Sequence, residues 1–171
     1  MELSLFDRAI KRGFDLFLSF FGLFFFSWLI FASWFLSTLY HKKNGFFTQN
    51  RIGRYGKKFK IIKIRTMYDD FTDLSTITTF SDKRISAFGK FLRKYKIDEL
   101  PQLINVLIGT MSFVGPRPDV EGFADRLDGN DRLILTLRPG ITGPATLEYK
   151  NEEFLLDNVK NKEEENMRIF K

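Results

Sequence analysis

The feature that most constrains this chain is the run of 25 residues from Leu16 to Tyr40, which contains no charged side chain and is crowded with Phe and Leu. As a helix it would be about 37 Å long, because each residue adds 1.5 Å. That length is enough to cross the hydrocarbon core of a bilayer. We therefore expect a membrane-embedded helix near the N-terminus, and a single transmembrane span is its ordinary interpretation.

The charges beside this run favour a different topology. Basic residues stand on both sides of it, with Arg8, Lys11 and Arg12 before it and Lys42, Lys43, Arg51 and Arg54 after it. Short basic flanks prefer the cytoplasm, so a single span would leave one of them outside. A helix that enters the bilayer, breaks and returns keeps both flanks inside. Gly22 and Ser27 can loosen a helix, because a hydroxyl can bond back to a freed carbonyl. We predict the membrane break at Ser27.

Charge and cysteine content narrow the classes of function. The 171 residues contain no cysteine, which excludes disulfides and thiolate metal sites. From His41 to Ile97 there are 15 Lys and Arg against 4 Asp and Glu, whereas from Asp119 to Lys171 there are 8 against 12. A basic middle region suits nucleic acid, anionic lipid or phosphorylated substrates.

Periodicity predicts the elements after the apolar run. Residues 46–53 and 58–67 alternate polar with apolar around Gly53-Arg54-Tyr55-Gly56, which predicts a β-hairpin. Residues 69–82 are polar and aperiodic, which is typical of a loop. Residues 83–96 have the pattern of a basic amphipathic helix. We also expect helix over 119–137, and the charged residues 148–171 are helical in composition.

An acidic pair opens the stretch with the clearest chemistry. Asp98 is a good N-cap, Pro101 is tolerated in a first helical turn, and the apolar residues up to Leu107 recur at helical spacing. A helix N-terminus attracts anions and keeps a carboxylate ionised. Prolines fix the backbone around Arg117, a forked donor suited to phosphate. These features suggest phosphoryl chemistry with a metal ion. The alternative is a capped helix whose acids face water.

Three motifs give the chain a family resemblance. They are Asp98-Glu99-Leu100-Pro101-Gln102, Ser112-Phe113-Val114-Gly115-Pro116-Arg117-Pro118 and Arg138-Pro139-Gly140-Ile141-Thr142-Gly143. In this order they resemble the bacterial sugar transferases, the monotopic phosphoglycosyl transferases that start lipid-linked glycan assembly. The resemblance runs from about Lys11 to about Asn151.

The resemblance implies a mixed α/β fold with a membrane-embedded, re-entrant helix in residues 1–40. A cytoplasmic catalytic domain with helices and a β-hairpin would follow in residues 41–171, on the inner membrane of a bacterium. The family breaks its helix at a Ser-Pro pair, and the matching pair here is Ser27-Trp28. Family members also continue further, so this chain is short at its C-terminus relative to the family. Thr110 stands where the family usually has an acid.

The implied activity moves a sugar 1-phosphate from a nucleotide diphosphate sugar to polyprenyl phosphate. Asp98 would be the nucleophile and a ligand of Mg²⁺, and Glu99 would assist it. Phosphate-binding roles are implied for Lys63, Arg93, Arg117 and Arg138. Expected partners are both substrates, membrane lipid and downstream glycosyltransferases, whereas nucleic acid is not expected. The alternative function is a membrane-anchored basic module that binds anionic lipid or a partner protein without effective catalysis.

Overall fold

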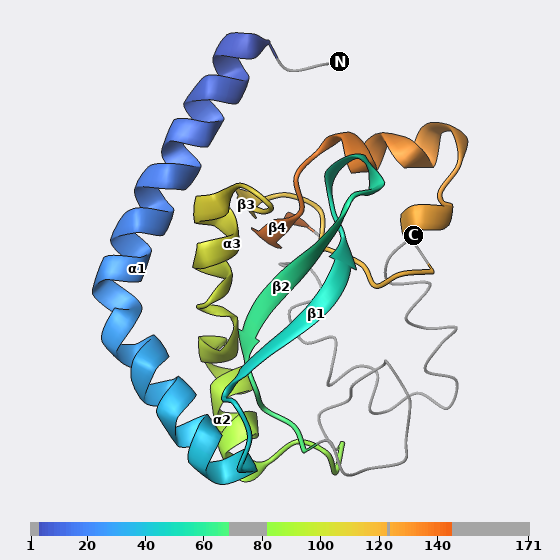
Figure 1. The fold of residues 1–171 in the computed structure, drawn as a ribbon. Helices are drawn as coiled ribbons and strands as arrows, with labels where there is room; N and C mark the ends of the chain where they lie inside the picture. Colours follow the sequence, from blue (N-terminus) through green and yellow to red (C-terminus); the bar gives the residue numbers. More distant parts are fainter. Residues whose placement is uncertain (1–3, 69–81, 123, 145–171) are drawn as a thin grey trace.

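The computed structural model describes residues 4–68, 82–122 and 124–144, which form a mixed α/β fold beside one long helix (Figure 1). The predicted loop over 69–82 and the helical tail over 148–171 lie almost wholly outside these residues. Within them, the mixed fold with an N-terminal apolar helix and a β-hairpin confirms the fold class that the sequence predicts.

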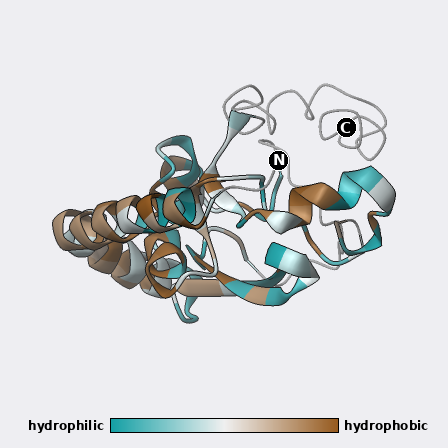
Figure 2. Cartoon of the chain, turned by 90° about the horizontal axis from the view of Figure 1, so that it is seen from above, coloured by the Kyte–Doolittle hydropathy of each residue, from teal (hydrophilic) through white to brown (hydrophobic). Residues whose placement is uncertain are grey.

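The long helix α1 covers Leu5–His41 and begins at the N-cap Ser4, whose hydroxyl accepts a hydrogen bond from the backbone N–H of Asp7 at 3.1 Å. It ends at Lys42, which adopts the left-handed conformation with φ of 51°. Among the described residues, it is the one helix that is long and apolar enough to cross a membrane. Figure 2 shows α1 as a largely hydrophobic element at one side of the molecule.

Helix α1 runs through Ser27 without interruption, and the hydroxyl of Ser27 donates a hydrogen bond to the carbonyl of Phe24 at 3.1 Å. Figure 1 shows the helix bowed, with its concave side toward the rest of the molecule. The hydroxyl thus bonds back as the sequence suggests, but the helix is not broken at Ser27. A re-entrant path through a bilayer stays a prediction.

The two sides of α1 differ in character. Its buried residues are mostly small or polar, namely Asp15, Ser19, Ile30, Ser33, Ser37 and His41. Large aromatic residues such as Phe24 and Trp28 are more than two-thirds exposed. At Gly22, an added Cβ would lie 3.0 Å from a methyl of Leu103. Small residues let helices approach closely, so α1 packs its polar side on the domain and turns its aromatic side outward.

The predicted hairpin is confirmed. Strands β1 (Phe46–Ile52) and β2 (Lys58–Ile64) are antiparallel, with Phe46 opposite Ile64 and Ile52 opposite Lys58. The 3₁₀ turn η1 (Arg54–Gly56) joins them, and Tyr55 takes φ of 59° there. Buried Ile61 of β2 packs with Val106 and Met111 to form the core beneath the hairpin.

Two short helices follow. Helix α2 (Ala87–Lys94) is shorter than predicted, because Ile85 pairs with Met67 in an isolated bridge and Ser86 caps the helix by accepting from the N–H of Gly89 at 2.9 Å. The 3₁₀ turn η2 (Ile97–Glu99) then leads into α3 (Gln102–Ile108). Helix α3 packs between α1 and β2 (Figure 1).

The structure also contains a second pair of strands, which are parallel and were not predicted from the sequence. Strands β3 (Ser112–Val114) and β4 (Gly140–Thr142) pair side by side, and each belongs to one of the sequence motifs. A side chain at Gly115 would collide with the backbone of Arg138. The pairing therefore brings the motifs around Arg117 and Arg138 into contact although about 20 residues separate them.

The predicted helix over 119–137 is wrong. The described residues of this segment form the 3₁₀ turns η3 (Ala124–Arg126) and η4 (Gly129–Thr136). Gly122 and Gly129 have φ of 97° and 57°, a left-handed conformation that interrupts an α-helix. Leu135 still contributes to a small core with Ile52 and Ala124.

Candidate active site

Asp98 and Glu99 lie in η2, between α2 and α3. The predicted capping role of Asp98 is wrong, because Pro101 occupies the N-cap position of α3 and no side-chain cap bond forms. Asp98 is 6% exposed, and its Oδ1 is buried without a hydrogen-bond partner among the described residues. The acids therefore do not simply face water, and a buried acceptor oxygen is available to a ligand.

Lys63 of β2 holds Glu99 in place. Its ammonium donates to Oε1 of Glu99 at 3.0 Å, and both side chains are about one-quarter exposed. Burial alone would raise the pKa of Glu99, but the positive charges of Lys63 and Lys96 outweigh it and lower that pKa to about 2. Glu99 is therefore ionised at all physiological pH values.

The pKa of Asp98 moves the other way. Burial raises it above the ordinary value of 3.8, the charge of Lys63 opposes the rise, and the charge of Glu99 adds to it. For Asp98, removal from water thus outweighs the favourable charges that the sequence analysis expected to favour its ionised form. Two adjacent carboxylates thus have different pKa values, as paired acids with different roles do.

Arg93 reaches the same place from α2. Its Nε donates to the hydroxyl of Thr66 at 3.0 Å, and its positive charge acts on Asp98. Arg117 approaches from the turn after β3, and its charge lowers the pKa of Glu99. The structure therefore gathers Lys63, Arg93 and Arg117 around the two acids.

Arg51 and Asp119 also belong here, although the sequence analysis gave Arg51 only as a basic flank. The guanidinium of Arg51 donates to the carbonyl of Pro118 at 3.2 Å, and the backbone N–H of Ile52 donates to the carbonyl of Asp119 at 2.9 Å. These two bonds tie β1 to the turn that carries Arg117. The hairpin alternation could have revealed Arg51, because residues 51 and 63 share one face in this register.

The charges of Arg51 and Asp119 act on each other and on Arg117. Burial and the charge of Arg117 lower the pKa of Arg51. Burial raises the pKa of Asp119, against the charges of Arg51 and Arg117. Two guanidiniums close together with one partly buried carboxylate leave net positive charge, which favours an anionic ligand.

Arg138 has different charged neighbours. Burial lowers its pKa, and the nearby positive charges of Arg12 and Arg54 lower it further. Lys63, Arg93 and Lys96 act on Asp98, and Lys63, Lys96 and Arg117 act on Glu99, without Arg138. Of the four phosphate-binding residues that the resemblance implies, Arg138 is thus the one that the structure sets apart.

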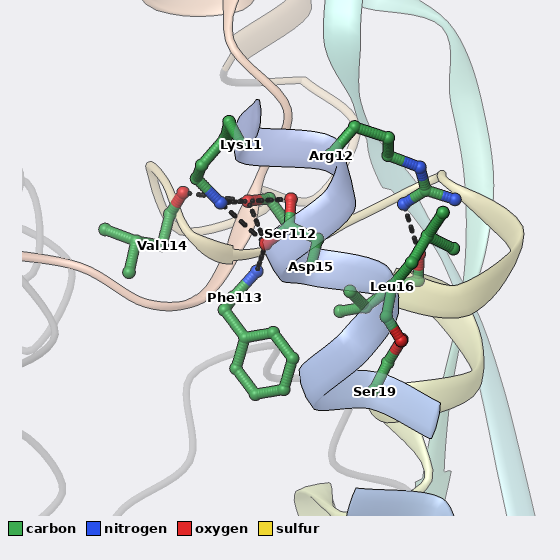
Figure 3. Close-up of polar contacts among 9 residues, drawn as sticks. Lys11, Arg12, Asp15, Leu16, Ser19, Ser112, Phe113 and Val114 are labelled. Carbon is green, nitrogen blue, oxygen red and sulfur yellow. Dashed lines mark hydrogen bonds and ion pairs between the residues drawn. The ribbon is translucent and has the colours of Figure 1, made fainter. Parts of the chain in front are cut away.

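A buried carboxylate in α1, which the sequence analysis did not single out, fastens the long helix to β3 (Figure 3). Asp15 is 1% exposed and accepts hydrogen bonds from Lys11 at 2.6 Å, from the Ser112 hydroxyl at 2.9 Å and from the N–H of Phe113 at 3.1 Å. Arg12 donates to the carbonyls of Val106 and Leu107 at 2.7 and 2.9 Å. Lys11 and Arg12, predicted as a flank beside the membrane, therefore contact the domain.

The cavities that border this region do not locate a binding site at Asp98 and Glu99, and the described residues show no cluster of potential metal ligands. A cavity of about 30 Å³ borders Arg117 and Asp119, and a groove of about 460 Å³ lies between Tyr55 and Thr136. Neither is lined by Asp98 or Glu99. No group of three or more His, Cys, Asp or Glu side chains occurs among the described residues.

Comparison with known proteins identifies the family. The model of the bacterial sugar transferases matches residues 6–167. This chain belongs to the bacterial sugar transferase family. The match covers α1, the acidic pair and both proline-containing motifs.

Individual members of the family have informative names. An Aeromonas hydrophila protein named UDP-N-acetylgalactosamine-undecaprenyl-phosphate N-acetylgalactosaminephosphotransferase is 37% identical over 140 residues, which are 80% of this chain and 33% of that protein. The undecaprenyl-phosphate galactose phosphotransferase of Salmonella typhimurium is 33% identical over 85% of this chain and 34% of its own length. The exopolysaccharide production protein ExoY of Rhizobium meliloti is 33% identical over 83% of this chain and 70% of its own length. The chain thus spans about a third of the first two relatives.

Proposed function

We propose that this chain transfers a sugar 1-phosphate from a nucleotide diphosphate sugar to polyprenyl phosphate, the first step of a lipid-linked glycan. The observation that carries the proposal is the unbonded, buried Oδ1 of Asp98 among the cations Lys63, Arg93 and Arg117. The names of two relatives, which specify undecaprenyl-phosphate phosphotransferases, support the same reaction.

Asp98 acts as the nucleophile in this proposal. Its carboxylate attacks the phosphorus that carries the sugar, a new Asp98–phosphate bond forms, and the bond to the departing nucleoside monophosphate breaks. An oxygen of polyprenyl phosphate then attacks the same phosphorus and releases the Asp98 carboxylate. Two steps suit substrates that reach the site from water and from a membrane.

The surrounding residues reduce the repulsion between anionic reactants. Lys63, Arg93 and Arg117 bind the phosphate oxygens and offset the charge that builds up during transfer. Glu99 keeps Lys63 in position through their 3.0 Å ion pair. Arg51 acts as a positioning residue, because its bond to the carbonyl of Pro118 holds the turn that carries Arg117.

A magnesium ion fits the acidic pair, because Asp98 offers an unbonded carboxylate oxygen and Mg²⁺ binds through one or two carboxylates plus substrate phosphates. Asp98 would be its protein ligand. When bound, the ion would neutralise phosphate charge. Oε1 of Glu99 is already engaged by Lys63, so Glu99 would contribute mainly to the charge of the site.

We further propose that the chain acts at the cytoplasmic face of a bacterial inner membrane, where downstream glycosyltransferases would take up the lipid-linked product. Both ends of α1 contact the same domain. Asp15 bonds to β3, and the hydroxyl of Ser37 donates to the carbonyl of Arg65 at 2.7 Å. A straight span would separate these two contacts by the thickness of the bilayer, so the contacts support a helix that returns to its face of entry.

The test is transfer of radiolabel from a panel of nucleotide diphosphate sugars to polyprenyl phosphate by the purified chain in nanodiscs. We expect transfer from at least one donor, and none from the Asp98→Asn variant at equal membrane incorporation. Transfer by that variant at a rate close to that of the wild type would remove Asp98 from the reaction. Absence of transfer from every donor, with lipid binding intact, would favour a basic membrane module instead.

A further inference from the structure

Arg138 forms no ion pair with any of the residues that the structure describes. Its side chain is partly buried and makes no hydrogen bond or ion pair within the part of the chain that the structure describes. Partial burial of a guanidinium costs free energy unless a hydrogen-bonded anion compensates for it. The nearest acid that acts on it is Asp15, which already accepts from Lys11, Ser112 and Phe113. Arg138 therefore has donors that no described residue accepts, and these donors are available to an anion.

The positive charges of two other guanidiniums act on Arg138, and backbone carbonyls hold both of them. Arg12 donates to Val106 and Leu107, as described above. Arg54 donates from Nε to the carbonyl of Thr136 at 2.7 Å, and its guanidinium stacks on the ring of Tyr55 at 4.5 Å. Among the described residues neither forms an ion pair with a carboxylate. The backbone thus fixes these positive charges without neutralising them.

A chain of hydrogen bonds fixes the backbone segments that carry the three arginines relative to one another. Asp15 follows Arg12 by three residues and accepts from Ser112 (Figure 3). The N–H of Ser112 donates to the carbonyl of Pro139 at 2.9 Å, next to Arg138. On the other side, Arg54 holds Thr136, two residues before Arg138. The guanidiniums of Arg12 and Arg54 and the backbone of Arg138 are therefore held in place before an anion arrives, which lowers the entropic cost of binding it.

The position of this group indicates what kind of anion it meets. Arg12 lies one helical turn before Leu16, where the uncharged run of α1 begins. Exposed apolar side chains lie on the adjoining segments, with Ile108 64% and Val114 54% exposed. A site at the start of a membrane-embedded helix, with cations beside apolar surface, suits a phosphate that carries an apolar tail.

We propose that Arg12, Arg54 and Arg138 form a second anion site, apart from the residues around Asp98, that binds the phosphate of a lipid. The lipid is either a prenyl phosphate or an anionic phospholipid, since both present the same chemistry to three guanidiniums. If the proposed function holds, a prenyl phosphate bound here would be the acceptor waiting beside the site of transfer. The second site itself does not depend on turnover.

The experiment measures lipid binding by the full chain in a neutral detergent, without any nucleotide sugar. The probes are farnesyl phosphate, farnesol, and short-chain phosphatidylglycerol and phosphatidylcholine, followed by native mass spectrometry or calorimetry. We expect one phosphate-bearing lipid to bind and the two lipids without net negative charge to bind more weakly. Arg138→Gln and Arg54→Gln should each weaken the phosphate-dependent binding about tenfold, the scale of one charged hydrogen bond.

Matched variants separate this site from general charge effects. Arg126→Gln removes an exposed arginine that makes no hydrogen bond among the described residues, and it should bind lipid as the wild type does. Arg138→Lys keeps the charge and should retain more lipid binding than Arg138→Gln. Retained binding by Arg138→Lys would also show that a substitution at position 138 does not unfold the protein. Selective loss of farnesyl phosphate, of phosphatidylglycerol or of both would support the site and identify its ligand.

Two results would overturn the proposal. One is unchanged binding of both phosphate lipids by Arg138→Gln and by Arg54→Gln. The other is an equal loss in Arg126→Gln, which would mean that overall charge alone drives binding. Because no donor sugar is present, a failure of the transfer reaction would leave these outcomes unaffected.

Discussion

The ammonium of Lys63 lies 3.0 Å from Oε1 of Glu99, and the pKa values of this acid and of the adjacent Asp98 shift in opposite directions. The pKa of Glu99 falls to about 2, whereas burial raises that of Asp98. A carboxylate must be ionised to attack phosphorus. If the proposed chemistry is correct, the pH at which activity is lost on acidification therefore reports Asp98 and not Glu99.

We expect kcat/KM to fall with decreasing pH through a pKa above the ordinary 3.8 of an aspartic acid. Glu99→Gln removes a negative charge that raises the pKa of Asp98, so its acid limb should move to lower pH. Lys63→Met removes a positive charge that lowers the pKa of Asp98, so its acid limb should move to higher pH. Normalised pH–rate profiles in nanodiscs measure both shifts, and shifts in the opposite directions would refute this electrostatic account.

The contact between Asp15 and β3 makes a second prediction. Asp15→Asn leaves the Lys11 ammonium without its carboxylate and offers one acceptor oxygen instead of two. Because the site is buried, we expect a loss of about 1–3 kcal/mol in the free energy of unfolding. The measurement is the denaturant midpoint in detergent for Asp15→Asn and for Asp7→Asn, an exposed control at the start of α1. Equal stabilities would mean that the Asp15 contacts do not fasten α1 to the domain.

Local patterns predicted much of this fold. Alternation around Gly53 and Gly56 is a short-range signal, and the hairpin forms as expected. The parallel pair of β3 and β4 was missed because each strand has three residues and the two are far apart in sequence. Asp15 looked like one more polar residue before an apolar run. Its burial depends on Ser112 and Phe113, almost 100 residues away, and no periodicity reveals such a contact.

For the candidate site too, local sequence predicted which residues belong to it but not the surroundings of each side chain. The motifs located Asp98, Glu99 and Arg117, because each stands in a distinctive local sequence. The environment of each side chain could not be foreseen, since the burial of Asp98 depends on the packing of η2 against α2 and β2. For the same reason Arg138, which carries an equally distinctive motif, has Arg12 and Arg54 as charged neighbours instead of the acids.

The next prediction is that both ends of α1 lie on the same side of the membrane. The chain has no cysteine, so a single introduced thiol is unique. Ala9→Cys and Lys43→Cys place thiols at exposed positions near the two ends. Gly45 is unsuitable, because a side chain there would collide with the backbone of Trp34. We expect a membrane-impermeant thiol reagent to label both positions from the same side.

Labelling from opposite sides would establish a spanning helix. Trp28→Pro, which restores the Ser-Pro pair of the family at Ser27, provides the matched control. If α1 already returns to its face of entry, this change should kink the helix near position 28 and leave the labelling pattern as it is. A pattern that becomes same-sided only after Trp28→Pro would mean that the native helix spans the bilayer.

The covalent route makes the sharpest chemical prediction. Asp98→Asn keeps the size and much of the polarity of the side chain but removes the nucleophile, so transfer should fall to background while folding and membrane incorporation persist. With the wild type, omission of the lipid acceptor should raise the intact mass by one sugar phosphate, and initial rates should show ping-pong behaviour. Glu99→Gln should still form the adduct, more slowly, because Lys63 loses its partner but Asp98 remains. Robust transfer without any adduct, or appreciable activity of Asp98→Asn, would make Asp98 a ligand rather than the nucleophile.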